Sequence, residues 1–132
     1  MKNVKYIHTA LTLIAIILFA GCTKFGTAVV EIKSASVESP NRLKVFAEIT
    51  DDGGCDYFME QGFCYSLFNN PSLSDVFSTQ ITVVDGYSTE LVFCDSSATL
   101  PMSDTSYYVC AYVKNSAGLS YSPIVKVSTK VE

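Results

Sequence analysis

The stretch Thr105–Gly118, with the sequence TSYYVCAYVKNSAG, decides the fold class. Apolar side chains occupy every second position in its first half, which predicts a strand with one face turned to a core. Asn115–Gly118 then supplies a turn signal. The residues expected to face the core are Tyr107, Val109, Ala111 and Val113.

The same period-two pattern recurs on both sides of this stretch. Turn signals such as Asp51–Gly54, Asn69–Ser72 and Asp85–Gly86 separate the apolar segments. No segment after residue 22 shows the 3.6-residue period of a helix. The sequence therefore predicts an all-β, seven-stranded antiparallel β-sandwich. The expected strands lie at residues 28–37, 42–50, 62–67, 81–83, 91–93, 107–113 and 121–128.

The N-terminal segment has the pattern of an export signal. Lys2 and Lys5 precede an apolar run at residues 10–20, which is too short for a typical membrane-spanning helix. The run ends in FAGC at residues 19–22, which resembles the lipobox of bacterial lipoproteins, although Phe19 departs from the usual aliphatic residue. The resemblance implies that Cys22 carries a diacylglycerol and becomes the first residue after cleavage. A plain signal peptide and an uncleaved anchor remain alternatives.

The predicted organisation has three parts. Residues 1–21 are a lipoprotein signal peptide, residues 22–27 are a lipidated N-terminus with a short tether, and residues 28–132 form the β-domain. Thr23 follows the lipid cysteine where Asp would resemble an inner-membrane retention signal. The resemblance thus implies a lipid anchor in the bacterial cell envelope, at the outer membrane, with the periplasmic and surface faces both open.

The mature chain also resembles the fibronectin type III-like, immunoglobulin-like modules of bacterial cell-surface proteins. The resemblance rests on residues 51–54, 60–66, 70–75 and above all 105–118. It implies that Tyr107 is the tyrosine corner, with its hydroxyl directed back to the chain near Leu100 and Pro101. The chain departs from such modules in having Cys110 where many carry Arg, and in having no Trp.

Four cysteines remain besides Cys22, and an even number in an exported domain favours disulfides. In the fold implied by the resemblance, Cys64 and Cys110 lie on neighbouring antiparallel strands and point outward. That implies a Cys64–Cys110 bond closing a loop of about 45 residues, worth about 4 kcal/mol in the chain-entropy model. Cys55–Cys94 would follow as the second bond. Four free thiols remain an alternative, whereas a zinc site lacks both a C-x-x-C pair and a histidine.

Composition argues against several functions. Without Lys2 and Lys5 the chain keeps seven basic side chains against 13 acidic ones, which disfavours nucleic-acid binding. The single histidine, His8, lies in the predicted signal, so neither a Ser–His–Asp nor a Cys–His arrangement is available. The acidic cluster indicates a solvated turn, with a weak calcium site as the alternative, at Asp51, Asp52 and Asp56. No enzymatic activity and no cofactor are expected.

These features predict a membrane-anchored, non-catalytic lipoprotein that acts as a binding, adhesion or scaffolding module of the cell envelope. An accessory glycan-binding lipoprotein of a polysaccharide-uptake system is the alternative. Tyr108 and Tyr112 are expected to face outward and form a candidate binding face for a protein or glycan partner. The competing interpretation is that they only cover the Cys64–Cys110 pair.

Overall fold

A computed structural model describes residues 26–129, so the predicted signal peptide and Cys22 lie outside the described residues. The described chain forms eight strands and no helix. The strands are β1 (Val29–Glu38), β2 (Arg42–Asp51), β3 (Phe58–Ser66), β4 (Thr79–Ser88), β5 (Val92–Asp95), β6 (Ser106–Asn115), β7 (Gly118–Tyr121) and β8 (Val125–Ser128).

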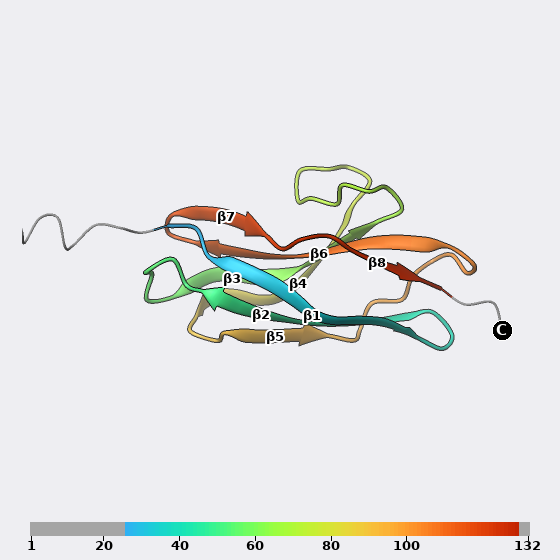
Figure 1. Cartoon of the computed structure of the whole chain (residues 1–132), viewed down its shortest axis with the longest axis horizontal. Helices are drawn as coiled ribbons and strands as arrows, with labels where there is room; N and C mark the ends of the chain where they lie inside the picture. Colours follow the sequence, from blue (N-terminus) through green and yellow to red (C-terminus); the bar gives the residue numbers. More distant parts are fainter. Residues whose placement is uncertain (1–25, 130–132) are drawn as a thin grey trace, which may run out of the picture.

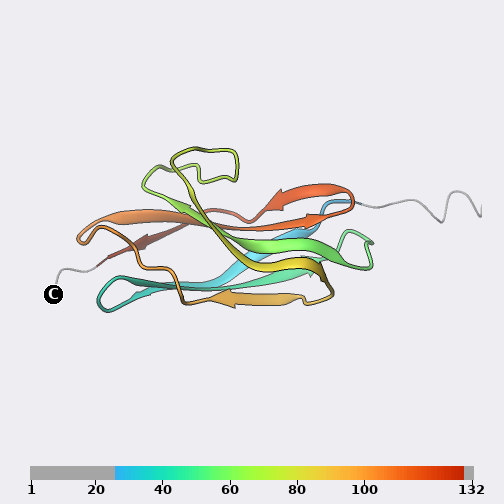
Figure 2. The same ribbon diagram turned by 180° about the vertical axis from the view of Figure 1, so that it is seen from behind.

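The strands form two antiparallel sheets that pack face to face (Figures 1 and 2). The smaller sheet has the order β1-β2-β5. The larger sheet has the order β4-β3-β6-β7, and β8 pairs with the first half of β6. The predicted all-β sandwich is confirmed, and the arrangement is compatible with an immunoglobulin-like or fibronectin type III-like domain.

The core lies between the sheets and is built by alternation along the strands. In β2 every second side chain is buried and the intervening ones are mostly exposed, so one face of this strand meets the core and the other meets solvent. Phe63 and Phe93 contact each other across the two sheets, with ring centroids 5.1 Å apart. The buried core residues are Ala28, Val30, Leu43, Val45, Ala47, Ile49, Phe58, Phe63, Tyr65, Phe93, Leu100, Tyr107, Val109, Ala111, Val113 and Val127.

The prediction of seven strands is wrong at the C-terminal end, where two strands replace the expected one at 121–128: β7 begins at Gly118, the last residue of the predicted turn, and β8 covers only Val125–Ser128. The division falls at Ser122–Ile124, which includes Pro123. Proline has no N–H for a ladder hydrogen bond, so pairing with β6 is interrupted there. Ser122 bridges the gap, since its N–H donates to Ala111 O at 2.9 Å and its hydroxyl accepts from Ala111 N at 2.8 Å.

The predicted turn at Asp85–Gly86 is also wrong, because β4 continues through it to Ser88. The register of β4 against β3 shifts between Phe58 and Glu60, and Gly86 has a φ of 106° at this shift. A strand bulge with glycine at positive φ accounts for both features. A Gly in this sequence context therefore marks an irregularity within a strand, and the turn lies at residues 89–91.

Gly26, at the start of the described chain, is held by hydrogen bonds at one end of the sandwich. Gly26 N donates to Gly53 O at 2.7 Å, and the buried Asn115 amide donates to Gly26 O at 2.9 Å and to Asp52 O at 3.3 Å. A Cβ at Gly53, whose φ is 73°, would lie 1.9 Å from Gly26 O, so only glycine fits. We call this end of the molecule, formed by Gly26, the β2–β3 loop and the β6–β7 turn, the tether end.

Candidate functional site

The β3–β4 loop, residues 67–78, is the segment that stands out from the sandwich. It leaves β3 at the end opposite the tether end and projects beyond the larger sheet, as the yellow-green loop at the top of Figure 1 shows. Its exposed side chains are unusually apolar. The exposed fractions are 42% for Leu67, 57% for Phe68, 89% for Val76 and 69% for Phe77.

We call these four residues the apolar cluster, and its two aromatic members, Phe68 and Phe77, are in contact. The rings of Phe68 and Phe77 meet edge to face, with centroids 5.2 Å apart and an interplanar angle of 61°. This geometry is the one that aromatic pairs favour. The two ends of the loop thus meet at these two exposed rings.

Polar groups inside the loop fix its conformation. The carboxylate of Asp75 accepts hydrogen bonds from Phe77 N at 3.1 Å and from the Ser78 hydroxyl at 2.9 Å. The Ser78 hydroxyl in turn accepts from Ser72 N at 3.2 Å. Side-chain oxygens that satisfy nearby backbone N–H groups are typical of structured turns. The apolar cluster is therefore presented by an ordered loop.

The base of the loop covers the outer face of the larger sheet. Leu73 packs on a small buried cluster formed by Cys64, Cys110 and Tyr112, and Leu73 N donates to the Tyr121 hydroxyl at 3.0 Å. The thiol of Cys110 approaches Pro71 O at 3.5 Å. Because of this cover, β3 and β6 are buried on both faces for much of their length.

Cys64 and Cys110 stand directly opposite each other on β3 and β6, which is the register expected from the resemblance. Their sulfur atoms are 3.1 Å apart and share a hydrogen bond. The hydrogen bond to Cys110 and burial both raise the pKa of the Cys64 thiol well above its ordinary range. No disulfide is present in residues 26–129, so the Cys64–Cys110 bond stays a prediction for the oxidised protein.

The expectation that Tyr112 is part of an exposed binding face is wrong. Tyr112 is fully buried, because its ring lies over Gly62 on β3 and its hydroxyl accepts from Gln80 on β4 at 2.8 Å. A Cβ at position 62 would lie 2.8 Å from Tyr112 Cε1. Burial raises the pKa of Tyr112, and its hydrogen bonds with Thr82 and Gln80 oppose this. Tyr112 therefore ties together three strands.

The other two tyrosines of β6 have different surroundings. Tyr107 is buried, and its hydroxyl accepts a hydrogen bond from Met102 N at 3.0 Å, next to the Leu100–Pro101 pair where the resemblance places this contact. Tyr108 is partly exposed, with Lys126 Nζ 5.9 Å from the centre of its ring. Tyr108 and Tyr112 do not form a joint surface.

The predicted Cys55–Cys94 pair is wrong. Cys55 follows the end of β2 and lies 3.2 Å from the Ser116 hydroxyl, whereas Cys94 on β5 is opposite Phe46 in the middle of β2. The five residues from Phe46 to Asp51 span about 17 Å in a strand, so the two thiols lie at different places. Pairing Cys55 with Cys94 as the two remaining cysteines could not reveal this separation, because the position of Cys55 depends on the course of the β2–β3 loop.

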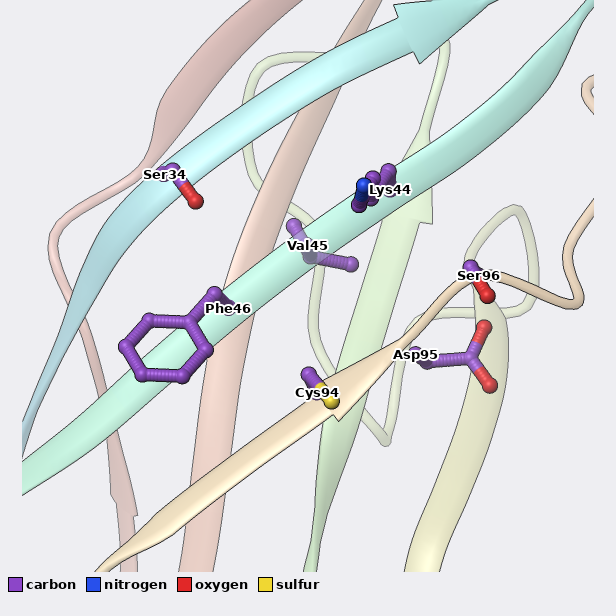
Figure 3. A pocket seen from close by; sticks show the side chains of 7 residues that line it. All are labelled: Ser34, Lys44, Val45, Phe46, Cys94, Asp95 and Ser96. Atoms are coloured by element: carbon purple, nitrogen blue, oxygen red, sulfur yellow. The ribbon is translucent and has the colours of Figure 1, made fainter.

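Cys94 instead borders a hollow of about 260 Å³ on the smaller sheet (Figure 3). Phe46, which is 39% exposed, is the one aromatic residue in its lining. The surface of the hollow is mostly apolar, although four of its lining residues, two serines, one lysine and one aspartate, have polar side chains. Its lining residues are Ser34, Lys44, Val45, Phe46, Cys94, Asp95 and Ser96.

The acidic cluster has a structural role in the β2–β3 loop. Asp51 and Asp52 each accept a hydrogen bond of 2.8 Å from a backbone N–H two residues ahead, at Gly53 and Gly54. Both contacts are typical of Asx-turns. Asp56 makes no such contact, and nowhere in residues 26–129 do three His, Cys, Asp or Glu side chains gather as a metal site would require. The weak calcium alternative thus gains no support.

No protein-family model and no curated protein matches this chain. Across residues 26–129 there is no helix of the length and hydropathy needed to cross a membrane. The assignment of function therefore depends on the surface chemistry of the domain itself.

The sequence interpretation missed the apolar cluster. Leu67 was expected to continue the core face of β3, but β3 ends at Ser66 and Leu67 is exposed. Val76 and Phe77 lie between Asp75 and Ser78 in a segment rich in turn residues. A pair of large apolar residues in such a segment was the available signal, although periodicity does not distinguish an exposed pair from a buried one.

Proposed function

We propose that this chain is a lipid-anchored, non-catalytic binding module of a bacterial cell envelope, which holds a partner protein through the apolar cluster of the β3–β4 loop. The single observation that carries the proposal is the exposure of Leu67, Phe68, Val76 and Phe77 on an ordered loop. Exposed apolar patches on small soluble domains are typical of interaction sites.

The anchor is the first part of the proposal. Cys22 would carry the lipid, and the four residues from Cys22 to Gly26 reach about 14 Å when extended. Gly26 is fixed to the tether end by its hydrogen bonds with Gly53 and Asn115. The lipid would therefore hold the tether end close to the bilayer, while β3 leads the apolar cluster away from it.

The identity of the domain is the second part. We assign it to the fibronectin type III-like class because three strands face a larger sheet and because the hydroxyl of Tyr107 contacts Met102 N. Modules of this architecture commonly act through loops and sheet edges, but the fold by itself does not assign a partner. The partner must be argued from the surface.

The chemistry of the apolar cluster favours a protein partner. Its side chains are two Phe, one Leu and one Val, which offer apolar area and no hydrogen-bonding groups. Covering the exposed parts of Phe68 and Phe77, roughly 250 Å² if each side chain offers about 200 Å², would contribute about 6 kcal/mol before the cost of association. A glycan ligand would require hydrogen-bonding groups that these side chains lack.

Co-purification of the native lipidated protein from detergent-solubilised membranes tests the interface. Phe77→Ser is expected to weaken retention of the partner at least tenfold, because a buried Phe contributes about 1.5–3 kcal/mol. The matched control is Phe46→Ser, which alters an exposed Phe on the smaller sheet and should leave retention unchanged. Equal loss with both variants, or a ligand that proves to be a glycan, would contradict the proposal.

Mass spectrometry of the intact mature protein tests the anchor independently. The expected mass is that of residues 22–132 with a diacylglycerol on the Cys22 thiol. Cys22→Ser should prevent lipid attachment, so the mass of a diacylglycerol should be absent from the variant. An unmodified Cys22 in the membrane-bound protein would contradict the anchor while leaving the interface experiment valid.

A further inference from the structure

A second surface lies along the edge of the larger sheet. Within residues 26–129, β4 pairs only with β3, and its other edge has no strand beside it. β4 is ten residues long. The backbone N–H and C=O groups on a free edge are able to pair with another extended chain.

Of the features that usually protect an edge, the first six residues of β4 carry only a bulge, at the register shift that leaves Val83 between the partners of Gln61 and Gly62. Thr79–Val84 reads TQITVV, with no charge, no proline and no glycine, and all residues except Gln80 are β-branched. Such neutral segments with high strand propensity pair readily with other strands. Lys, Pro, bulges and short length are the usual protections of an edge.

The remaining edges are protected. β1 carries Glu31 and Lys33, which form an ion pair of 2.8 Å, together with Glu38 near its end. β5 has only four residues. The edge formed by β7 and β8 is interrupted at Pro123. Among the described strands, β4 is therefore the edge most open to strand addition.

A shallow apolar pocket adjoins this edge near the bulge. It has a volume of about 250 Å³ and is lined by Met59, Asp85, Gly86 and Tyr87. Tyr87 is 81% exposed and Met59 is 45% exposed, and the ring of Tyr87 meets that of Tyr57 edge to face at 4.8 Å. In strand addition, main-chain hydrogen bonds provide affinity, and pockets beside the edge select side chains.

We propose that the edge of β4 is a docking site for an extended, uncharged segment of another protein, which adds to the larger sheet at Thr79–Val84 and places an apolar side chain between Met59 and Tyr87. Because Thr79–Val84 is neutral, a charged segment would gain no electrostatic attraction there to offset the free-energy cost of desolvating its charges. An uncharged segment does not have that cost. This site shares no residue with the apolar cluster.

A second copy of the chain is a poorer occupant, and this choice rests on the proposed lipid anchor. β4 runs toward the tether end, since its partner β3 begins there and the two strands are antiparallel. Antiparallel pairing of two β4 edges would place the two tether ends at opposite ends of the joint sheet. Two lipids about 14 Å from their domains could not then enter one bilayer with the strands upright.

The test uses the mature protein and synthetic ten-residue peptides that alternate Val, Ile or Phe with Thr or Gln, with blocked ends and an uncharged polyether tail for solubility. Fluorescence anisotropy measures binding, and amide hydrogen exchange locates it. We expect protection within Thr79–Val84 and none in β1. Two isomers of the best peptide, N-methylated at odd or at even positions, provide the main control, because alternate N–H groups of an added strand face the edge. One isomer should lose at least tenfold in affinity and the other should bind unchanged.

Two matched variants test the site on the protein. Val83 on β4 and Val37 on β1 are both partly buried against the core, so Val83→Lys and Val37→Lys should cost similar stability. Only Val83→Lys should reduce peptide binding tenfold or more, because a charge beside the edge opposes strand addition. Phe77→Ser should leave peptide binding unchanged, which separates this site from the apolar cluster.

Several results would overturn the proposal. These are equal binding of both N-methylated isomers, protection located on β1 or on residues 67–78, and absence of binding by every peptide at millimolar concentration. Dimerisation of the mature protein in sedimentation, with the same protection of Thr79–Val84 in the absence of peptide, would assign the edge to a second copy.

Discussion

Gly62→Ala should destabilise the domain, because the structure leaves no room for a methyl group at this position. The added Cβ would lie 2.2 Å from Ile81 O, 2.7 Å from the Tyr112 hydroxyl and 2.8 Å from Tyr112 Cε1. Ile81 O belongs to the backbone of β4, so relief would require the strand to move. The overpacking costs about 1–3 kcal/mol, and loss of the Tyr112–Gln80 hydrogen bond adds about 1 kcal/mol.

The smaller backbone entropy of unfolded Ala offsets about 0.4–1 kcal/mol of this cost. The expected net loss is therefore about 2–3 kcal/mol, or roughly 10–20 °C in Tm for a domain of this size. Urea unfolding followed by far-UV circular dichroism measures it, since the chain has no Trp to serve as a fluorescent probe. The control is Gly26→Ala, where nothing lies within 4 Å of the added Cβ. If Gly62→Ala unfolds within about 0.5 kcal/mol of the unchanged protein, the packing of Tyr112 on β3 is refuted.

Three further perturbations have defined outcomes. Because burial raises the pKa of Tyr112, the folded domain keeps the phenol proton to a higher pH than the unfolded chain does. The free energy of unfolding should therefore fall as pH rises above about 10. Tyr112→Phe should make this fall less steep when urea unfolding is measured at several pH values, and an unchanged slope would contradict the assignment to Tyr112. Asn115→Ala should cost about 2–3 kcal/mol in thermal unfolding, since it removes the donor to Gly26 O and Asp52 O and the acceptor for two N–H groups of the β6–β7 turn; an unchanged Tm would contradict this role. Oxidation by a small-molecule disulfide should join Cys64 to Cys110, lower the mass by two hydrogens and stabilise the domain by about 4 kcal/mol. In a separate alkylation of the reduced protein, the exposed Cys94 should react before the three buried cysteines. A bond between any other two cysteines would contradict the register of β3 and β6.

The core could be predicted from the sequence because alternation reports burial directly. Tyr107, Val109 and Ala111 face the core as their spacing indicates. The same alternation ran through Pro123, where the strand breaks, because a hydropathy pattern does not register a missing N–H. Strand existence followed from the pattern, and strand ends depended on individual hydrogen bonds.

The surface could not be predicted in the same way. Tyr112 was placed on the correct face of β6 but not recognised as buried, since its cover comes from Leu73 in the β3–β4 loop and from Gln80 on β4. Gly62 was the signal available: a glycine inside a strand often marks a close approach, and the register of Cys64 with Cys110 sets it opposite Tyr112. The apolar cluster had no equivalent signal, because loop conformation depends on contacts far apart in sequence.

The most direct test of the central claim is photo-cross-linking in living cells, with p-benzoyl-phenylalanine replacing Val76 in the full-length, lipidated chain. Val76 is the most exposed residue of the apolar cluster, and Lys33 on β1 provides the control position. The account predicts a discrete adduct with one other protein from position 76, in the membrane fraction, and none from position 33. No adduct at position 76, or the same adduct from both positions, would contradict it.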